Sequence, residues 1–183
     1  IIFTHYVKQY PDVELVVQDL GTHEIIDELF KDNIDLGLVV LDNSLNRLES
    51  VVVSEGELLL LLPKGHPFEA VSEVPFEWLA PEKLIMYKPS TFISTRILQE
   101  FAKYSITPNI IHSANQIATI LNLVVCGAGI SFVLDDSNPL IKDSSNLVTR
   151  PLKSPIAYRA GLVWKEDKYL MDSVRDFLRF FKS

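Results

Sequence analysis

The stretch NQIATILNLVVCGAGISFVL, residues 115–134, changes its hydrophobic period from that of a helix to that of a strand within a few residues. Apolar side chains at positions 117, 120, 121, 124 and 125 repeat at helical spacing, and the run ISFVL after Gly127 and Gly129 is typical of a buried strand. Such a junction belongs to α/β proteins, where it also binds anions and cofactors. The rest of the chain is needed to decide between packing and binding.

The first forty residues show a similar alternation. The run VELVV at 13–17 predicts a strand, 22–31 an amphipathic helix and 34–41 a buried strand. This order forms a βαβ unit and implies a parallel sheet. Residues 1–10 are typical of the second half of a helix that Pro11 ends, because proline cannot continue a helix. We therefore expect the chain to begin inside a structural element.

Two apolar strands are predicted at 48–53 and 57–63, and a turn-rich segment, 64–75, follows them. After this segment, strand and helix patterns alternate a second time. Two similar α/β halves fit this order better than one. The patterns predict further strands at 83–87, 108–113, 130–134 and 157–165, and helices at 90–104, 117–125 and 170–181.

Composition excludes several classes of function. With 24 acidic and 17 basic residues the net charge is −7, which disfavours DNA binding by this chain itself. No apolar run is long enough to span a bilayer, and no signal-peptide pattern supports secretion. Cys126 is the single cysteine, and the four histidines lack the spacing of metal ligands. A third glycine at dinucleotide spacing and a P-loop lysine are also missing, so we expect no metal and no cofactor.

Five pieces, in order and spacing, resemble the effector-binding domain of LysR-type transcriptional regulators: YPDVELVV, LGTHEIIDELFKDNIDLGLVV, SEGELLLLLPKGHPF, ITPNIIHSANQIATILNLVVCGAGISFVL and AGLVWKEDKYLMDSVRDFLRFF. The resemblance implies an α/β fold of two Rossmann-like lobes joined by two crossing strands, like type II periplasmic solute-binding proteins. Lobe one would comprise residues 1–58 and 161–183, and lobe two residues 59–160. An N-terminal winged helix-turn-helix, a linker helix and the first strand of the domain are expected upstream of Ile1 and are not in this sequence.

The resemblance implies a cytoplasmic sensor that binds a small metabolite in the cleft between the lobes, and a carboxylate is the favoured class of metabolite. Binding would control DNA binding and transcription. DNA would be contacted only through the upstream domain, and no membrane is involved. An extracytoplasmic solute-binding protein of the same fold is the alternative. An enzyme is not expected, because no nucleophile and base share a motif and the sequence GAGIS is not the elbow of a serine hydrolase.

Candidate effector contacts lie at two expected helix starts. Thr22 would cap its helix, a role that could be its only one, or would also hold an oxygen of the effector. In KPSTFISTR, residues 88–96, hydroxyl donors gather around a second helix start and suit a small carboxylate, unless they only cap a solvent-facing turn. The family alignment makes this segment a wall of the effector site. The residues expected to contact effector there are Ser90, Thr91, Phe92 and Ile93.

Val40 is expected at the same site, at the end of its strand. Some relatives that bind dicarboxylates have an arginine there, so valine favours an effector with one carboxylate or less charge. His23 could face the effector, whereas His66 is expected to fix the geometry of a turn. Gly127 and Gly129 are expected to stop a helix and permit a close strand approach, and Cys126 to be a small buried core residue.

The family also implies an antiparallel, side-by-side homodimer, or a tetramer of the full-length protein. The paired surfaces would be residues 1–17 of one protomer and 93–112 of the other. Their apolar side chains support this arrangement, although they could instead fill each lobe's own core. The residues concerned are Phe3, Tyr6, Val7, Ile110 and Ile111.

Overall fold

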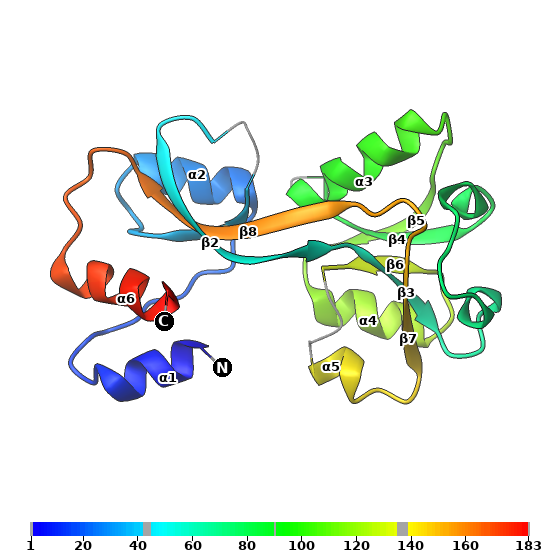
Figure 1. The fold of residues 1–183 in the computed structure, drawn as a ribbon, viewed down its shortest axis with the longest axis horizontal. Coiled ribbons are helices and arrows are strands. Elements are labelled where there is room, and N and C mark those ends of the chain that lie inside the picture. Colours follow the sequence, from blue (N-terminus) through cyan, green and yellow to red (C-terminus); the bar gives the residue numbers. More distant parts are fainter. Residues whose placement is uncertain (1, 42–44, 90, 135–138, 183) are drawn as a thin grey trace. The chain divides into compact units, whose positions relative to one another are not determined.

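Two strands carry the chain from one compact unit to the other in a computed structural model that describes residues 2–41, 45–89, 91–134 and 139–182. Unit 1 comprises Ile1–Glu55 and Arg159–Ser183, and unit 2 comprises Gly56–Tyr158. The two boundaries fall within β2 (Leu48–Glu57) and β8 (Ala157–Lys165) (Figure 1). Each unit mixes helices and strands, as the α/β prediction requires.

Unit 1 is a three-stranded sheet, in the order β1-β8-β2, with helices packed around it. β1 (Gly37–Val40) pairs antiparallel with β8, from Gly37 opposite Val163 to Val40 opposite Ala160. α2 (Thr22–Phe30) covers β1 and buries Leu29 against Val39 and Val163. α1 (Ile2–Gln9) and α6 (Asp172–Lys182) form a second core around Tyr6 and Phe177.

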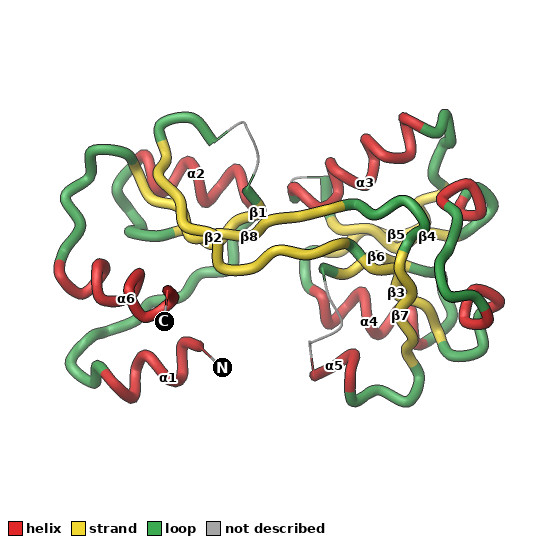
Figure 2. Tube along the Cα trace, viewed as in Figure 1, coloured by secondary structure: helices red, strands yellow, loops and turns green. Residues whose placement is uncertain are grey.

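The expected strand at 13–17 is wrong. The segment between α1 and α2 has no regular secondary structure and is drawn as loop in Figure 2. The expected parallel βαβ unit therefore does not form, and the strand that pairs with β1 is the antiparallel β8. The physical reason is the lack of a pairing partner: none of the described strands pairs with this segment, and a strand needs such a ladder to satisfy its backbone.

Unit 2 contains two small sheets. β3 (Leu59–Pro63) lies between β6 (Ser131–Val133) and β7 (Leu147–Pro151), and both pairings are antiparallel. β4 (Lys83–Tyr87) pairs in parallel with β5 (Asn109–Ala114). The helices α3 (Phe92–Lys103), α4 (Ile117–Val125) and α5 (Pro139–Lys142) complete the unit with 3-10 turns at Pro67–Ala70 and Phe76–Leu79. The patterns did not predict β7 or α5, which are short.

The junction between α4 and β6 is built for packing. Gly127 has φ +70° and ends the helix in the left-handed conformation that glycine adopts without strain. At Gly129 a Cβ atom would collide with the carbonyl oxygen of Lys83 in β4. This approach lets Ile130 donate its N–H to the same oxygen at 2.9 Å. The two expected roles, helix stop and close strand approach, are both confirmed.

Two burial expectations are wrong. Cys126 is exposed, because the helix has just ended there and its side chain points away from the face that buries Ile120, Leu121 and Val124. Tyr6 is buried, with 1% of its surface exposed, because α1 packs it against Phe177 of α6. Tyr6 therefore belongs to the core of unit 1 and is not available as part of a dimer surface.

Candidate functional site

The parallel pair β4 and β5 brings two helix starts to one edge of unit 2. β4 ends at Tyr87 and leads to α3, and β5 ends at Ala114 and leads to α4. Because parallel strands end at the same edge of a sheet, the N-termini of both helices lie there. In open α/β folds this is the edge where ligands bind.

Thr91 organises the start of α3. It is the N-cap, and its hydroxyl accepts the backbone N–H of Ser94 at 3.3 Å. The same hydroxyl donates to the carbonyl oxygen of Lys88 at 2.9 Å. Thr95 donates its hydroxyl to the carbonyl oxygen of Thr91 at 3.3 Å. Both hydroxyl protons are therefore already used within the loop, and an anion at this position would be met by backbone N–H groups first.

Three features make the start of α3 electropositive. Among the described residues, no hydrogen-bond acceptor faces the backbone N–H of Phe92 or Ile93. The first turn carries no acidic side chain. Lys88 is exposed and forms no ion pair within the described part of the chain. Free N–H groups and the helix dipole attract an anion, and the lysine adds a full positive charge.

Other predicted residues of this segment contribute less. Ser90 and the side chain of Phe92 lie outside the described residues, and Ile93 is half-buried. Tyr87, at the end of β4, packs against the apolar core of unit 2, and burial raises the pKa of its phenol to about 12. Tyr87 is thus neutral at physiological pH. Lys88 was missed by sequence reasoning, although it begins the segment KPSTFISTR.

The helix start in unit 1 differs from the sequence prediction. The N-cap of α2 is Gly21 and not Thr22, which is the first helical residue. The cap is closed by Glu24, whose carboxylate accepts the N–H of Gly21 at 2.8 Å. Thr22 and Val40 are half-buried, and the hydroxyl of Thr22 has no hydrogen-bond partner among the described residues. Because Glu24 already supplies a negative charge, this start suits an anion less well than the start of α3.

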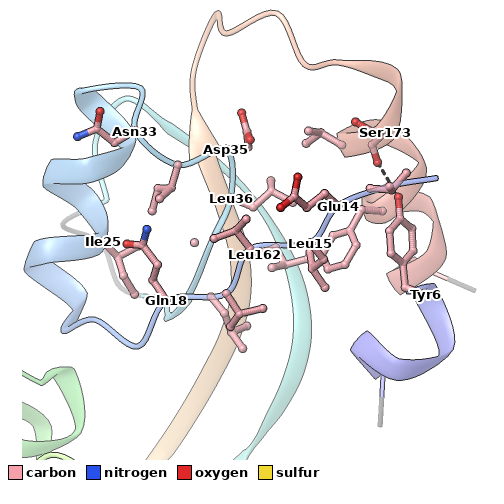
Figure 3. Close-up of a pocket in the computed structure, with 18 of the residues that line it drawn as sticks. Tyr6, Glu14, Leu15, Gln18, Ile25, Asn33, Asp35, Leu36, Leu162 and Ser173 are labelled. Atoms are coloured by element: carbon pink, nitrogen blue, oxygen red, sulfur yellow. Dashed lines mark hydrogen bonds between the residues drawn. The ribbon is translucent and has the colours of Figure 1, made fainter. Parts of the chain in front are cut away.

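A pocket of about 520 Å³ lies elsewhere in unit 1 (Figure 3). It is lined by residues 13–20, by residues 33–38 and by parts of α1, β8 and α6, including Tyr6, Leu162 and Phe177. None of the predicted effector residues lines this unit 1 pocket. It is therefore a separate feature from the two helix starts.

The histidines and acids do not form a metal or catalytic cluster in the described ranges. No group of three or more His, Cys, Asp or Glu residues there could hold a metal ion. His66 accepts the N–H of Phe68 at Nδ1, 3.2 Å away, which confirms its expected role in a turn. His23 is exposed on α2. No helix in the described part of the chain is long and apolar enough to cross a bilayer.

Comparison with curated proteins matches the chain to HTH-type transcriptional regulators. The chain is 30% identical over 128 residues to YnfL, an HTH-type transcriptional regulator of Escherichia coli K12, which covers 69% of this chain and 43% of that protein. The chain spans about half the length of the curated relatives it matches, 43% to 59% for three of them.

Solved structures show the same fold. The CcmR regulatory domain of Synechocystis PCC6803 in complex with 2-PG superposes with a TM-score of 0.89 at 18% identity, covering 98% of this chain and 87% of that one. The effector binding domain of QuiR in complex with shikimate gives 0.85 at 18% identity, covering 98% and 86%. These likenesses confirm the expected fold of the type II periplasmic-binding-protein kind.

The family model described as the LysR substrate binding domain matches residues 2–183, nearly the whole chain. The curated relatives that the chain matches include HTH-type transcriptional regulators. This agrees with the resemblance read from the five sequence pieces. The chain belongs to the LysR substrate binding domain family.

Proposed function

We propose that this chain is the ligand-sensing part of a cytoplasmic transcription regulator and that its effector is a small metabolite with one carboxylate. The observation that carries the proposal is the start of α3, where the N–H groups of Phe92 and Ile93 have no acceptor among the described residues and the first turn has no acidic side chain. Exposed Lys88 precedes this helix by only a few residues. The carboxylate would accept hydrogen bonds from these N–H groups and lie near the ammonium of Lys88.

The relatives support a small anionic ligand. One fold neighbour was solved with shikimate and another with 2-PG. Within unit 2, half-buried Ile93 on α3 would supply apolar contact to the remainder of the effector. The contacts expected of Thr22 and Val40, which lie in unit 1, stay predictions. Val40 offers no second cation, which favours one carboxylate over two.

The proposed output is a change in how the regulator binds DNA through a domain outside this chain. An effector can cause this only by binding one conformation of the protein better than another. We also infer that the ligand is released unchanged, because the proposed contacts include no general base or nucleophile poised for chemistry.

A ligand screen with matched variants tests the site. Small monocarboxylates and their methyl esters are screened by thermal shift, since a ligand at 100 times its dissociation constant adds about 2.7 kcal/mol of stability. We expect acids to bind and esters not to bind. Calorimetry on Lys88→Met should then show affinity weakened about tenfold, as expected for about 1.4 kcal/mol of lost charge attraction.

Two controls make this result specific. Lys153→Met removes an exposed lysine of the same unit that is distant in sequence from α3, and it should leave affinity unchanged. Thr91→Ser keeps the capping hydroxyl and should bind normally, whereas Thr91→Val loses the cap and should bind at least tenfold more weakly. Equal affinity of Lys88→Met, Thr91→Val and the unmodified chain would refute the site at α3.

A further inference from the structure

The second 3-10 turn of unit 2 holds an exposed tryptophan on a buried base. Phe76 and Leu79 at its two ends are 1% and 0% exposed, whereas Trp78 between them is 47% exposed. Side chains three residues apart in a 3-10 helix point the same way, so the buried pair directs Glu77 and Trp78 toward solvent. The indole is therefore displayed from a turn that is anchored in the core of the unit.

The first 3-10 turn, Pro67–Ala70, supports one side of this indole. Phe68 is 8% exposed, and its ring centroid lies 5.8 Å from that of Trp78. Arg150 of β7 fixes the turn to the sheet, because its guanidinium donates to the carbonyl oxygen of Glu69 at 2.6 Å. The inner part of the indole thus has a fixed neighbour, and the outer part is free to contact another molecule.

The charge around the indole is negative. The segment 64–82 carries four glutamates and one lysine, Lys64, which lies 4.0 Å from a glutamate of the first turn. Glu73 and Glu77 are exposed, and neither forms an ion pair with a described residue. Lys153 reaches this region through its backbone, but its ammonium is not paired with them either. Carboxylates beside an aromatic face favour a cationic partner.

We propose that Trp78 and Glu77 form a docking surface for a basic segment of another protein, in which an arginine stacks on the exposed indole and pairs with the carboxylate. The guanidinium suits both parts, because it is planar, is always charged and bonds a carboxylate through two N–H groups. Tryptophan and arginine are also enriched among the residues that dominate the energy of protein interfaces.

Charge favours this occupant over the alternatives. The phosphates of a nucleic acid or of an anionic membrane would be repelled by Glu73 and Glu77 and by the net charge of −7. A second copy of this chain in a two-fold contact would bring the same acidic surface against itself. A basic polypeptide meets neither penalty.

The docking surface is distinct from the proposed effector site. Phe76 packs against Phe101 and Tyr104 at centroid distances of 4.7 and 4.8 Å, and both rings belong to the end of α3. Ile93, at the start of α3, is about 12 Å from Phe101 along the helix axis. Docking is therefore expected with or without an effector, and it does not depend on the proposed function.

Peptide titration followed by NMR tests the proposal on this chain. Hexa-arginine should shift the indole N–H signal of Trp78 and leave that of Trp164 unchanged. Trp164 is a matched reference in unit 1, because its N–H is bonded to a carboxylate of Glu49 at 3.0 Å. Hexa-lysine should bind about fourfold more weakly, since it stacks less well on an indole. Hexa-glutamate and duplex DNA should cause no shift.

Variants locate the contact through the backbone amide signals of the turn. Trp78→Leu keeps an apolar side chain and should weaken hexa-arginine binding about fourfold. Glu77→Gln should weaken it about threefold, the effect of one exposed ion pair. Glu166→Gln makes the same charge change at an exposed position of unit 1 and should have no effect.

The contrary outcomes are equally clear. Equal shifts of the two indoles, or equal weakening by Glu77→Gln and Glu166→Gln, would mean general attraction to an acidic protein and would overturn the docking surface. Equal affinity for hexa-lysine and hexa-arginine would overturn the stacked arginine. A shift of Trp78 with duplex DNA would assign the surface to a different class of partner and would also refute the proposal.

Discussion

Gly129 shows how one atom can decide whether two strands meet. Ile130 donates its N–H to the carbonyl oxygen of Lys83, and Ile85 donates its N–H to the carbonyl oxygen of Ile130 at 2.8 Å. These bonds hold the backbone at Gly129 so close to β4 that a Cβ atom has no room. The collision is with backbone, which cannot rotate away as a side chain can.

We predict that Gly129→Ala lowers the free energy of unfolding by about 3 kcal/mol, at the upper end of the cost of overpacking. Gly65→Ala is the matched control. Gly65 has φ +82° and nothing within 4 Å of a built Cβ, so it should lose only about 1 kcal/mol from the left-handed backbone. Urea unfolding measures both, and equal losses would contradict the assigned collision.

The ion pair of Asp32 makes the stability of the protein depend on pH. Its carboxylate accepts a hydrogen bond from Lys165 at 2.9 Å, which, with a smaller contribution from Lys168, lowers the pKa of Asp32. A lowered folded pKa means that the interaction stabilises the protein above the unfolded pKa of about 4 and is lost as the pH falls through the folded value.

We therefore expect Lys165→Met to raise the pKa of Asp32 toward its ordinary value. The loss of protein stability that comes from protonating Asp32 at low pH should then disappear. Lys168→Met should raise the pKa less, because its ammonium is 3.5 Å from the carboxylate and contributes less. NMR titration of the Asp32 carboxyl carbon in the three proteins provides the measurement. The reverse order of the two variants would show that the assigned cause is wrong.

At the scale of elements, α1 is an integral part of unit 1. Tyr6 stacks on Tyr10 with ring centroids 4.7 Å apart and meets the rings of Phe177 and Phe180 edge-on. Its hydroxyl is bonded to Ser173 at the start of α6. The same residue was expected on a dimer surface, and its burial instead makes α1 dependent on α6.

We predict that Tyr6→Phe lowers the free energy of unfolding by about 1 kcal/mol, the net worth of one hydrogen bond. Tyr6→Ala should lower it by about 3–5 kcal/mol, because a large ring is lost from a packed core. Denaturant unfolding measures both variants. A Tyr6→Ala protein as stable as Tyr6→Phe would mean that the aromatic cluster does not hold α1 in place.

At the scale of the whole molecule, only some of the residues expected on the dimer surface are exposed. Val7 on α1 is 42% exposed, and Ile110 and Ile111 on β5 are 40% and 36% exposed. β5 pairs with β4 alone among the described strands, so its outer edge is free. The side chain of Phe3 lies outside the described residues. We propose that β5, together with α1 of a second protomer, forms the homodimer.

We predict that light scattering gives about twice the protomer mass of 20.7 kDa and that Ile110→Asp reduces it to one protomer. An aspartate at the centre of an apolar interface would be buried without a partner. Val125→Asp is the control, since Val125 is 40% exposed on α4, outside the proposed surface. A mass of one protomer across the micromolar range for the unmodified chain would rule out the dimer.

Local pattern predicted much of this fold. The patterns at 83–87, 117–125 and 157–165 match β4, α4 and β8. In α4 the buried side chains repeat at helical spacing, and in β4 both faces are buried, so its centre is a continuous apolar run. The candidate site was predicted less fully. The segment 88–96 was chosen for its hydroxyls, but the protons of Thr91 and Thr95 are given to backbone carbonyls, so Lys88 and free N–H groups become the better anion ligands.

The sequence by itself determined the α/β class, the family and the roles of Gly127 and Gly129, since helical and strand periods and glycine turns are properties of neighbouring residues. Only the tertiary structure decided that Tyr6 is buried, that Cys126 is exposed and that residues 13–17 stay unpaired. Burial depends on which distant element packs against a side chain. A strand likewise forms only when another strand pairs with its backbone. The run VELVV has the propensity for a strand, but its sequence does not specify which strand would pair with it.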